Sequence, residues 1–357
     1  MRHRPILAIA APLSLLLALT GCGSEADGAD TSPSQGGQET QAADGPLEKL
    51  IADAKSEGEV VVYAHQDETV LQAVADGFQK KYGISVEYSR MVSGDIIQRY
   101  SAEADAGSIV ADVTMQTSSA FVRDAIKKGW MMPLKDADIP GFPADWPEKF
   151  VLDEDGSAIV GLAPFGIAYN TDLVSKEDAP KTWEDLLDPK WKGEILLSDP
   201  TSGPSYAGLF DALLEEYGPD LLTGIGDSVL RTNASMVPNL EALGAGEAAL
   251  GVPSLPTLVD TAKKSGAPIE FVRMEFATGT DSAVGFTADG PHFNAARLFV
   301  HYVLSEEGQR LLNGQPGAAS PLTEEGLPAE YQRPRPESLV PARQSEMWKL
   351  MGLKSVS

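Results

Sequence analysis

Four segments of this 357-residue sequence place small hydroxyl side chains, glycine or histidine where a predicted strand gives way to a predicted helix. Free backbone N–H groups at a helix start, together with Ser and Thr hydroxyls, bind carboxylate, phosphate and phosphonate oxygens. The same residue types also act as ordinary helix N-caps. The segments are His65-Gln66, Ser93-Gly94, Thr117-Ser118 and Thr201-Ser202-Gly203, the last followed closely by Tyr206. We expect several of them to contact one bound solute.

One segment comes near a hydrolase motif. Gly203-Pro204-Ser205-Tyr206-Ala207 approaches the nucleophile elbow Gly-x-Ser-x-Gly, but alanine stands at its last position. Beyond the N-terminal leader the only histidines are His65, His292 and His301, and His301 lies in an amphipathic helical pattern that favours packing. No His-Glu-x-x-His zinc motif occurs. We therefore predict that the chain is not an enzyme, with a secreted serine hydrolase using Ser205 as the alternative.

The composition excludes several classes of function. Asp and Glu number 52 against 28 Lys and Arg, which gives a formal net charge of −24. A nucleic-acid-binding protein needs a basic surface to neutralise phosphates, and this chain has no basic run. The single cysteine, Cys22, rules out an internal disulfide and any cysteine-bound metal centre. Apolar residues make up 43% of the chain, which is enough to build a substantial core.

The N-terminus has the features of a secretory leader. Two arginines precede an apolar stretch at residues 5–19 that is too short for a comfortable membrane span. Leu19-Thr20-Gly21-Cys22 follows and resembles a bacterial lipobox, in which the cysteine is lipidated and becomes the new N-terminus. Residues 23–46 lack aromatic, basic and large aliphatic side chains, as flexible tethers do. We predict a signal peptide over residues 1–21, a tether over residues 22–46 and a lipid anchor outside the cytoplasmic membrane.

The first half of the body alternates between predicted strands and helices. Buried-strand patterns at residues 59–63, 84–88 and 110–113 are separated by helical patterns. This order normally gives a parallel sheet with right-handed crossovers. Ligands bind beside the carboxyl ends of such strands, and three of the four segments above follow these strands.

The second half repeats this alternation with different lengths. Strands are predicted at residues 194–198, 250–252 and 270–274, and Thr182 with Asp185 forms a capping box at a helix start. Extended stretches at residues 158–170 and 278–287 suit crossings between lobes. We predict an α/β fold of two lobes joined by two extended crossings. The expected boundaries are residues 47–165 for lobe 1 with a return at roughly 280–330, residues 166–279 for lobe 2, and residues 331–357 for a C-terminal helix or tail.

Six segments along the body resemble the substrate-binding proteins of bacterial ABC importers, in the group that includes ferric-iron binding proteins. They are IVADV at residues 109–113, GIAYN at 166–170, PKTWEDLLDPKWKG at 180–193, DPTSG at 199–203, GEAALG at 246–251 and FVHYVLSEEGQ at 299–309. The resemblance implies a type II periplasmic-binding fold, whose lobes close on a solute and present it to a membrane permease and its ATPase. It also implies a monomer without a cofactor. A receptor that reports to a sensor would use the same closure.

The resemblance leaves two classes of ligand open. Ferric members of the group supply adjacent tyrosines from the loop that corresponds to Pro253-Ser254-Leu255-Pro256, which has none here. His65 does match a histidine of some ferric members. The tyrosines that could rearrange to bind iron are Tyr63, Tyr169 and Tyr206. A small organic anion such as a phosphonate or an organophosphate suits this loop better, with Ser254 and Tyr169 completing the candidate ligand residues. Arg231 could pair with its anionic end or form a surface salt bridge.

Overall fold

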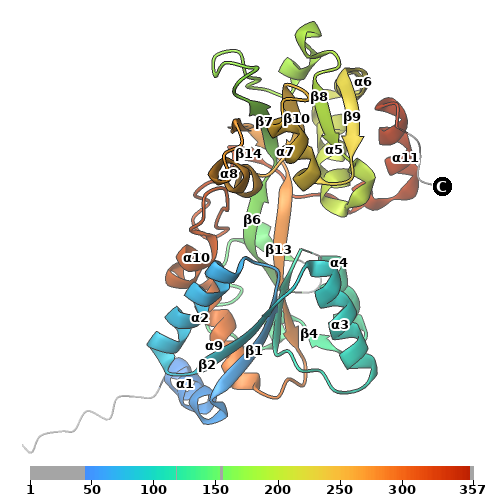
Figure 1. The fold of residues 1–357 in the computed structure, drawn as a ribbon. Coiled ribbons are helices and arrows are strands. Elements are labelled where there is room, and N and C mark those ends of the chain that lie inside the picture. The colour runs from blue at the N-terminus through green and yellow to red at the C-terminus, as the bar shows by residue number, and fades with distance from the viewer. Residues whose placement is uncertain (1–44, 118, 153–155, 354–357) are drawn as a thin grey trace, which may run out of the picture. The chain divides into compact units, whose positions relative to one another are not determined.

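The computed structural model describes residues 45–117, 119–152 and 156–353, which belong to one unit (Figure 1). The predicted signal peptide, Cys22, most of the tether and Ser118 lie outside the described residues. Among the residues that are described, no helix has both the length and the apolar character needed to cross a membrane.

The first lobe is built on a mixed sheet with the strand order β2-β1-β3-β13-β6-β5, and β4 pairs with β13. β1, β2 and β3 run parallel, as the alternating pattern predicts, whereas β13 runs antiparallel to β3 and β6. The strands are β1 (Glu59–Ala64), β2 (Ser85–Arg90), β3 (Val113–Gln116), β4 (Met131–Met132), β5 (Val151–Leu152), β6 (Ser157–Pro164) and β13 (Gly279–Thr287). The helices are α1 (Pro46–Glu57), α2 (Glu68–Tyr82), α3 (Ser93–Asp105), α4 (Ser119–Lys127), α9 (Phe293–Leu304) and α10 (Glu306–Asn313).

The second lobe has its own five-stranded sheet in the order β11-β7-β10-β8-β9, in which β8, β9 and β10 run parallel. Its strands are β7 (Gly166–Asn170), β8 (Ile195–Ser198), β9 (Val229–Asn233), β10 (Leu250–Ser254) and β11 (Ile269–Arg273). Its helices are α5 (Pro204–Tyr217), α6 (Pro219–Ser228), α7 (Met236–Gly244), α8 (Pro256–Lys264) and α11 (Pro341–Leu350). Short 3-10 turns complete the fold: η1 (Leu134–Asp136), η2 (Glu148–Phe150), η3 (Glu184–Leu187), η4 (Pro189–Trp191), η5 (Pro200–Ser202) and η6 (Pro336–Leu339). Each lobe buries a separate apolar core.

Both predicted crossings are present. β6 continues through Phe165 into β7, and β12 (Phe276–Ala277) leads into β13, so two extended segments join the lobes (Figure 1). The chain then passes between the lobes a third time, which sequence patterns did not indicate. After α10, β14 (Glu330–Tyr331) pairs with β12, and α11 packs on α5 and α6 of the second lobe.

The third strand of the first sheet lies three residues later than predicted. The ladder with β1 begins at Val113, and the preceding Asp112 is fully buried. Its carboxylate accepts hydrogen bonds from the backbone N–H of Val61 at 2.8 Å and of His292 at 2.9 Å. Asp112 therefore connects β1 to the start of α9. The apolar pattern at residues 109–113 corresponds to this connection, and the strand begins only at its last residue.

Candidate functional site

The carboxyl ends of the parallel strands in both sheets lie beside the crossing strands. In the first sheet β1 ends next to His65, which hydrogen-bonds to Ser282 of β13. In the second sheet Ser254 at the end of β10 pairs with Gly166, the first residue after the crossing. Helices α2, α3 and α4 begin at the first edge, and α5, α7 and α8 begin at the second. Helix N-termini from both lobes therefore gather at the crossings, as ligand binding in α/β folds requires.

The loop after β1 is fixed to a crossing strand. His65 Nε2 lies 3.1 Å from Ser282 Oγ, and the Gln66 side chain donates to the same oxygen at 2.9 Å. Burial lowers the pKa of His65 to about 4, and the nearby positive charge of Arg90 acts in the same direction. His65 is therefore a neutral hydrogen-bonding group at physiological pH.

The loops after β2 and β3 are joined through a serine. Ser93 Oγ accepts hydrogen bonds from the backbone N–H of Thr117 at 3.1 Å and from its hydroxyl at 3.0 Å. Gly94, in the first turn of α3, is exposed, and a Cβ placed there would meet nothing within 4 Å. The structure thus brings two of the predicted segments together and leaves an open helix start beside them.

The loop after β8 is organised by an acidic residue. The Asp199 carboxylate accepts from the Thr201 backbone N–H at 2.9 Å and from its hydroxyl at 2.7 Å, while Ser202 Oγ donates to the Asp199 carbonyl at 2.7 Å. Gly203 follows as the N-cap of α5. The two hydroxyls therefore shape the turn, and the N–H groups at the start of α5 are the groups left for a ligand.

Tyr206 and Ser254 differ in what they can offer to a solute. The half-buried Tyr206 ring stacks on Phe165 of the crossing, and burial raises its pKa while the Met236 N–H opposes this rise. Ser254 is fully buried and donates to the Gly251 carbonyl at 3.0 Å. Of these two predicted residues, Tyr206 has its ring and hydroxyl beside the crossing. The Ser254 hydroxyl is bonded to a carbonyl of its own strand.

Two residues from the sequence analysis are not brought to this edge. Tyr169 pairs with Leu250 at the amino end of β10, the end opposite Ser254. Arg231 forms a 2.7 Å ion pair with Glu247, and both side chains are nearly half exposed. Of the two roles considered for Arg231, the structure shows the surface salt bridge.

Two residues that sequence reasoning missed do lie here. Arg90 is the last residue of β2, 4.0 Å from the carboxylate of Asp67, and places a positive charge near His65. Ser282 lies within β13 and anchors the loop after β1. A basic residue two positions after the predicted strand at 84–88 was an available signal for Arg90, whereas no motif marks Ser282.

Catalytic and metal-binding arrangements find no support in the described part of the chain. His65 contacts Ser282, His292 contacts Asp112, and His301 contacts the Pro140 carbonyl, so the hydrogen bonds of the three histidines go to groups other than Ser205. Within residues 45–117, 119–152 and 156–353, no three His, Cys, Asp or Glu side chains are grouped to hold a metal.

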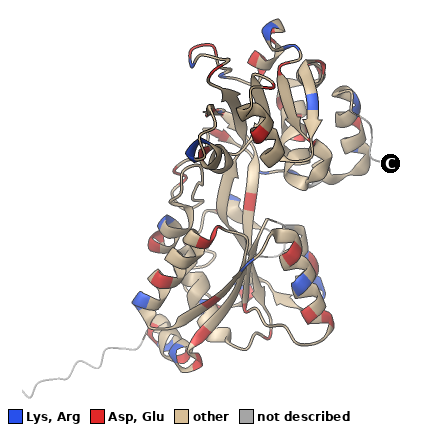
Figure 2. Ribbon diagram, in the orientation of Figure 1, with Lys and Arg blue, Asp and Glu red and all other residues tan. Residues whose placement is uncertain are grey.

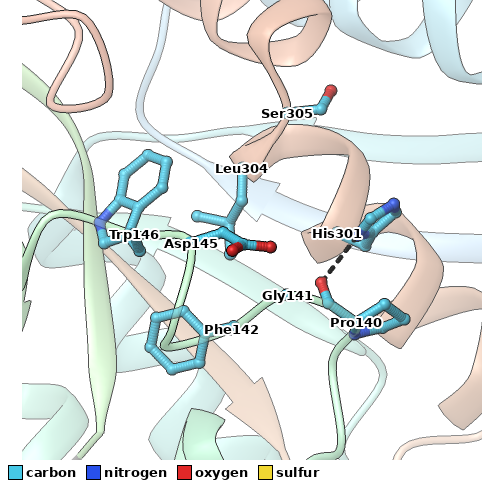
Figure 3. A pocket seen from close by; sticks show the side chains of 8 residues that line it. All are labelled: Pro140, Gly141, Phe142, Asp145, Trp146, His301, Leu304 and Ser305. Atoms are coloured by element: carbon cyan, nitrogen blue, oxygen red, sulfur yellow. Dashed lines mark hydrogen bonds between the residues drawn. The ribbon is translucent and has the colours of Figure 1, made fainter.

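A separate pocket of about 130 Å³ lies on the first lobe (Figure 3). The loop at residues 140–146 forms one side, and His301, Leu304 and Ser305 from the end of α9 form the other. None of the predicted ligand residues lines it, so it is distinct from the carboxyl edges. Basic and acidic residues are interspersed over both lobes (Figure 2), in keeping with the acidic composition.

Comparison with known proteins agrees with this architecture. An uncharacterised protein of Haemophilus influenzae is 28% identical over 268 residues, which cover 72% of this chain and 76% of that protein. Iron-bound HitA from Pseudomonas aeruginosa superposes with a TM-score of 0.62 at 22% identity, over 82% of this chain and 98% of HitA. AfuA from Actinobacillus pleuropneumoniae, with fructose-6-phosphate bound, gives 0.54 at 24% identity, over 77% of this chain and 88% of AfuA.

The family described as bacterial extracellular solute-binding protein matches residues 60–315, which include the six segments noted in the sequence from residue 109 to residue 309. This match spans both lobes, both predicted crossings and the loops at the two carboxyl edges. The fold shared with HitA and AfuA is the two-lobed type II periplasmic-binding fold. The chain therefore belongs to the bacterial extracellular solute-binding proteins.

Proposed function

We propose that this chain is the lipid-anchored solute-binding component of an ABC import system and that it closes its lobes around a small anionic organic solute, such as a phosphonate or an organophosphate. The observation that carries this proposal is the convergence of helix N-termini from both lobes at the crossing strands. Free N–H groups at helix starts favour negative oxygens. A solute touching both lobes stabilises the closed state by its differential affinity for that state.

The charges at these edges support an anionic solute. Arg90 contributes a guanidinium that is 43% exposed, and His65 stays neutral. Asp199 accepts two hydrogen bonds from Thr201, while Asp67, whose side chain is 78% exposed, lies 4.0 Å from Arg90 and offsets part of its charge. The edges thus offer positive charge and N–H donors although the whole chain carries a net charge of −24.

Ferric iron is the competing ligand, because HitA shares the fold and binds iron. Iron needs several anionic oxygen ligands. The tyrosines available here are occupied or distant: Tyr63 donates to Glu103 at 2.7 Å, Tyr169 lies at the amino end of β10, and Tyr206 stacks on Phe165. These contacts favour the organic anion.

A thermal-melt panel on the chain from Gly23 onward separates these ligands. Phosphonates, organophosphates, carboxylates, polyamines and ferric citrate are compared at equal concentration. A ligand at one hundred times its dissociation constant stabilises the native state by about 2.7 kcal/mol. We expect a shift with a phosphonate or phosphate ester. A shift with ferric citrate alone would replace the organic anion by iron.

Arg90 provides a matched test of the charge argument. Arg90→Gln should weaken binding of the active anion about 10- to 100-fold, because a charge-assisted hydrogen bond is lost. Arg310→Gln on α10 is the control, since it removes the same charge from an exposed position away from the two edges. Equal affinities of the two variants in titration calorimetry would remove Arg90 from the site.

The lipid anchor rests on the sequence around Cys22 and is tested separately. Cys22→Ser removes the thiol that the lipobox would present for lipidation. We expect this variant to leave the membrane fraction while keeping the solute affinity of the parent protein. Retention of the variant in the membrane fraction would argue against the anchor.

A further inference from the structure

Gln116, the last residue of β3, is a buried amide without hydrogen bonds. Its side chain is fully buried, and neither its nitrogen nor its oxygen has a partner. Buried polar groups are nearly always paired, because an unpaired one loses its bonds to water without replacement. A buried amide without partners at the end of a strand needs a reason, and a bound ligand is one.

Its position places it at the candidate site. Ala64 of β1 is in register with Met115, and the His65 N–H donates to the Met115 carbonyl at 3.1 Å, so His65 and Gln116 are neighbours across parallel strands. Gln116 also pairs with Ala283 of β13, the residue after Ser282. Gln116 therefore lies in one row with His65 and Ala283, one position along β13 from Ser282.

A second unpaired amide atom belongs to Gln66, the residue after His65. Gln66 donates from Nε2 to Ser282 Oγ, but its Oε1 is buried without a partner. Ser282 Oγ already contacts both His65 and Gln66, which uses most of the bonding capacity of one hydroxyl. The pairing of β13 with β6 shifts register between Ser282 and Ala283, an irregularity of the kind that re-aims side chains near functional sites.

We propose that Gln66 and Gln116 are specificity-determining residues that hydrogen-bond to hydroxyl groups of the solute, so that the solute is an anion carrying hydroxyls, as a polyol phosphate does. This inference rests on the proposed function. The two unpaired amide oxygens need a proton donor and the unpaired Gln116 nitrogen needs an acceptor. A hydroxyl supplies both, whereas a deprotonated phosphonate or carboxylate oxygen only accepts. The anionic end then belongs at the helix starts and Arg90, and the hydroxyl end at the amides.

The burial of the unpaired atoms sets a condition on binding. Gln66 is half-buried as a residue and Gln116 is fully buried, but the unpaired oxygen of each amide is itself buried. Side chains at the edge therefore have to move before a solute hydroxyl contacts either amide.

Titration calorimetry with three ligands tests the inference. Glycerol 3-phosphate and propyl phosphate carry the same anionic group and differ in hydroxyls, and inorganic phosphate carries the anion alone. We expect the wild-type protein to prefer glycerol 3-phosphate over propyl phosphate by about tenfold or more. Gln66→Leu and Gln116→Leu should reduce this preference below about threefold.

The stability of the free protein separates a ligand role from a structural one. Gln309 is a matched control, since it is equally buried but its amide bonds to the Val160 and Val303 carbonyls and to Ser320. Gln116→Leu should melt at or above the wild-type temperature, because it removes two unpaired atoms. Gln309→Leu should melt several degrees lower. Gln116→Met repeats the test if the leucine variant does not fold.

Each outcome bears on a definite claim. Equal wild-type affinities for glycerol 3-phosphate and propyl phosphate would overturn this inference and leave the proposed anionic solute standing. A Gln116→Leu variant that loses as much stability as Gln309→Leu would overturn it too, since the amide would then be structural. If none of the three ligands binds, the solute is not a phosphate ester and this inference fails, while the phosphonates and carboxylates of the melt panel still test the proposed anionic class.

Discussion

Tyr206 in the first turn of α5 stacks on Phe165 in the crossing between the lobes, with ring centroids 5.9 Å apart and ring planes 9° apart. Phe165 itself donates its N–H to the Thr278 carbonyl of the second crossing at 2.8 Å. The start of α5 is thereby connected to both crossings. A solute that binds to the N–H groups at the start of α5 is therefore connected, through Tyr206 and Phe165, to the two crossings that must bend when the lobes close.

This contact predicts different effects for two changes at Tyr206. Tyr206→Phe keeps the stack but removes the hydroxyl that accepts from the Met236 N–H, so the unfolding free energy should fall by about 1 kcal/mol while solute affinity falls up to about tenfold. Tyr206→Ala removes the stack and should lower the unfolding free energy by about 1–3 kcal/mol. Urea unfolding and calorimetry measure the two effects.

The control for Tyr206 lies on the same helix. Tyr217 is the last residue of α5, and its ring meets Phe276 edge-on. Tyr217→Phe makes the same chemical change at the opposite end of the helix and should leave affinity unaltered. If both phenylalanine variants bind equally well, the Tyr206 hydroxyl does not contact the solute.

The pKa of His65 predicts a pH dependence of stability. Burial lowers this pKa to about 4, so the native protein binds the proton less tightly than the unfolded chain. The stability contributed by neutral His65 is present above about pH 6.5 and is lost as the pH falls toward 4. Between pH 7 and 4.5, wild type should lose about 1–3 kcal/mol more than His65→Gln, which cannot titrate.

Two measurements check the His65 prediction. Urea unfolding of wild type and His65→Gln at pH 7 and 4.5 gives the difference between their losses of unfolding free energy. The titration of the carboxylates is common to both proteins and cancels to first order. Nuclear magnetic resonance of the ring follows the proton directly. A His65 titration midpoint near 6.5 would contradict the prediction.

Local patterns predicted most of the elements that carry the candidate site. Residues 59–63 have the apolar run of a central parallel strand, and β1 covers them. Thr182 and Asp185 exchange hydrogen bonds as a capping box does, although the segment is a 3-10 turn and not an α-helix. Because β1, β2 and β3 are parallel, the loops that follow them lie at one edge of the sheet, so the approximate location of these loops follows from the sequence.

The pairing of side chains within the site could not be predicted in this way. The bond between Ser93 and Thr117 and the bond between Gln66 and Ser282 join residues that are 24 and 216 positions apart. No local period encodes such partners, because they depend on how the sheet assembles. The third passage of the chain is a similar case, since it depends on pairing between β12 and β14.

The C-terminal helix is held to the second lobe by a buried carboxylate. Asp211 of α5 is fully buried and bonds to Arg335 at 2.9 Å and to Arg343 of α11 at 2.6 Å. Arg343→Met leaves one oxygen of a buried charge without its partner, so the unfolding free energy should fall by about 1–3 kcal/mol. Lys349→Met, an exposed position on α11, is the control and should change it by less than about 0.5 kcal/mol.

The last prediction concerns the third passage between the lobes. Tyr331 donates to the Asp281 carboxylate of β13 at 2.6 Å, and Arg333 donates to its other oxygen at 3.2 Å. Tyr331→Phe removes one of these donors from a carboxylate that is 14% exposed. The expected loss of unfolding free energy is about 1–3 kcal/mol at pH 7.5.

The size of this loss should depend on pH in a definite direction. Burial raises the pKa of Asp281, so its native state holds a proton more tightly than the unfolded chain does. Lowering the pH toward this raised pKa therefore relieves the cost of the buried charge, and the effect of Tyr331→Phe should shrink between pH 7.5 and 4.5. Tyr88→Phe is the control, because Tyr88 donates to Glu68 at the surface and its loss should cost much less. A loss that stays constant between pH 7.5 and 4.5 would show that Tyr331 acts through packing and not through the Asp281 charge.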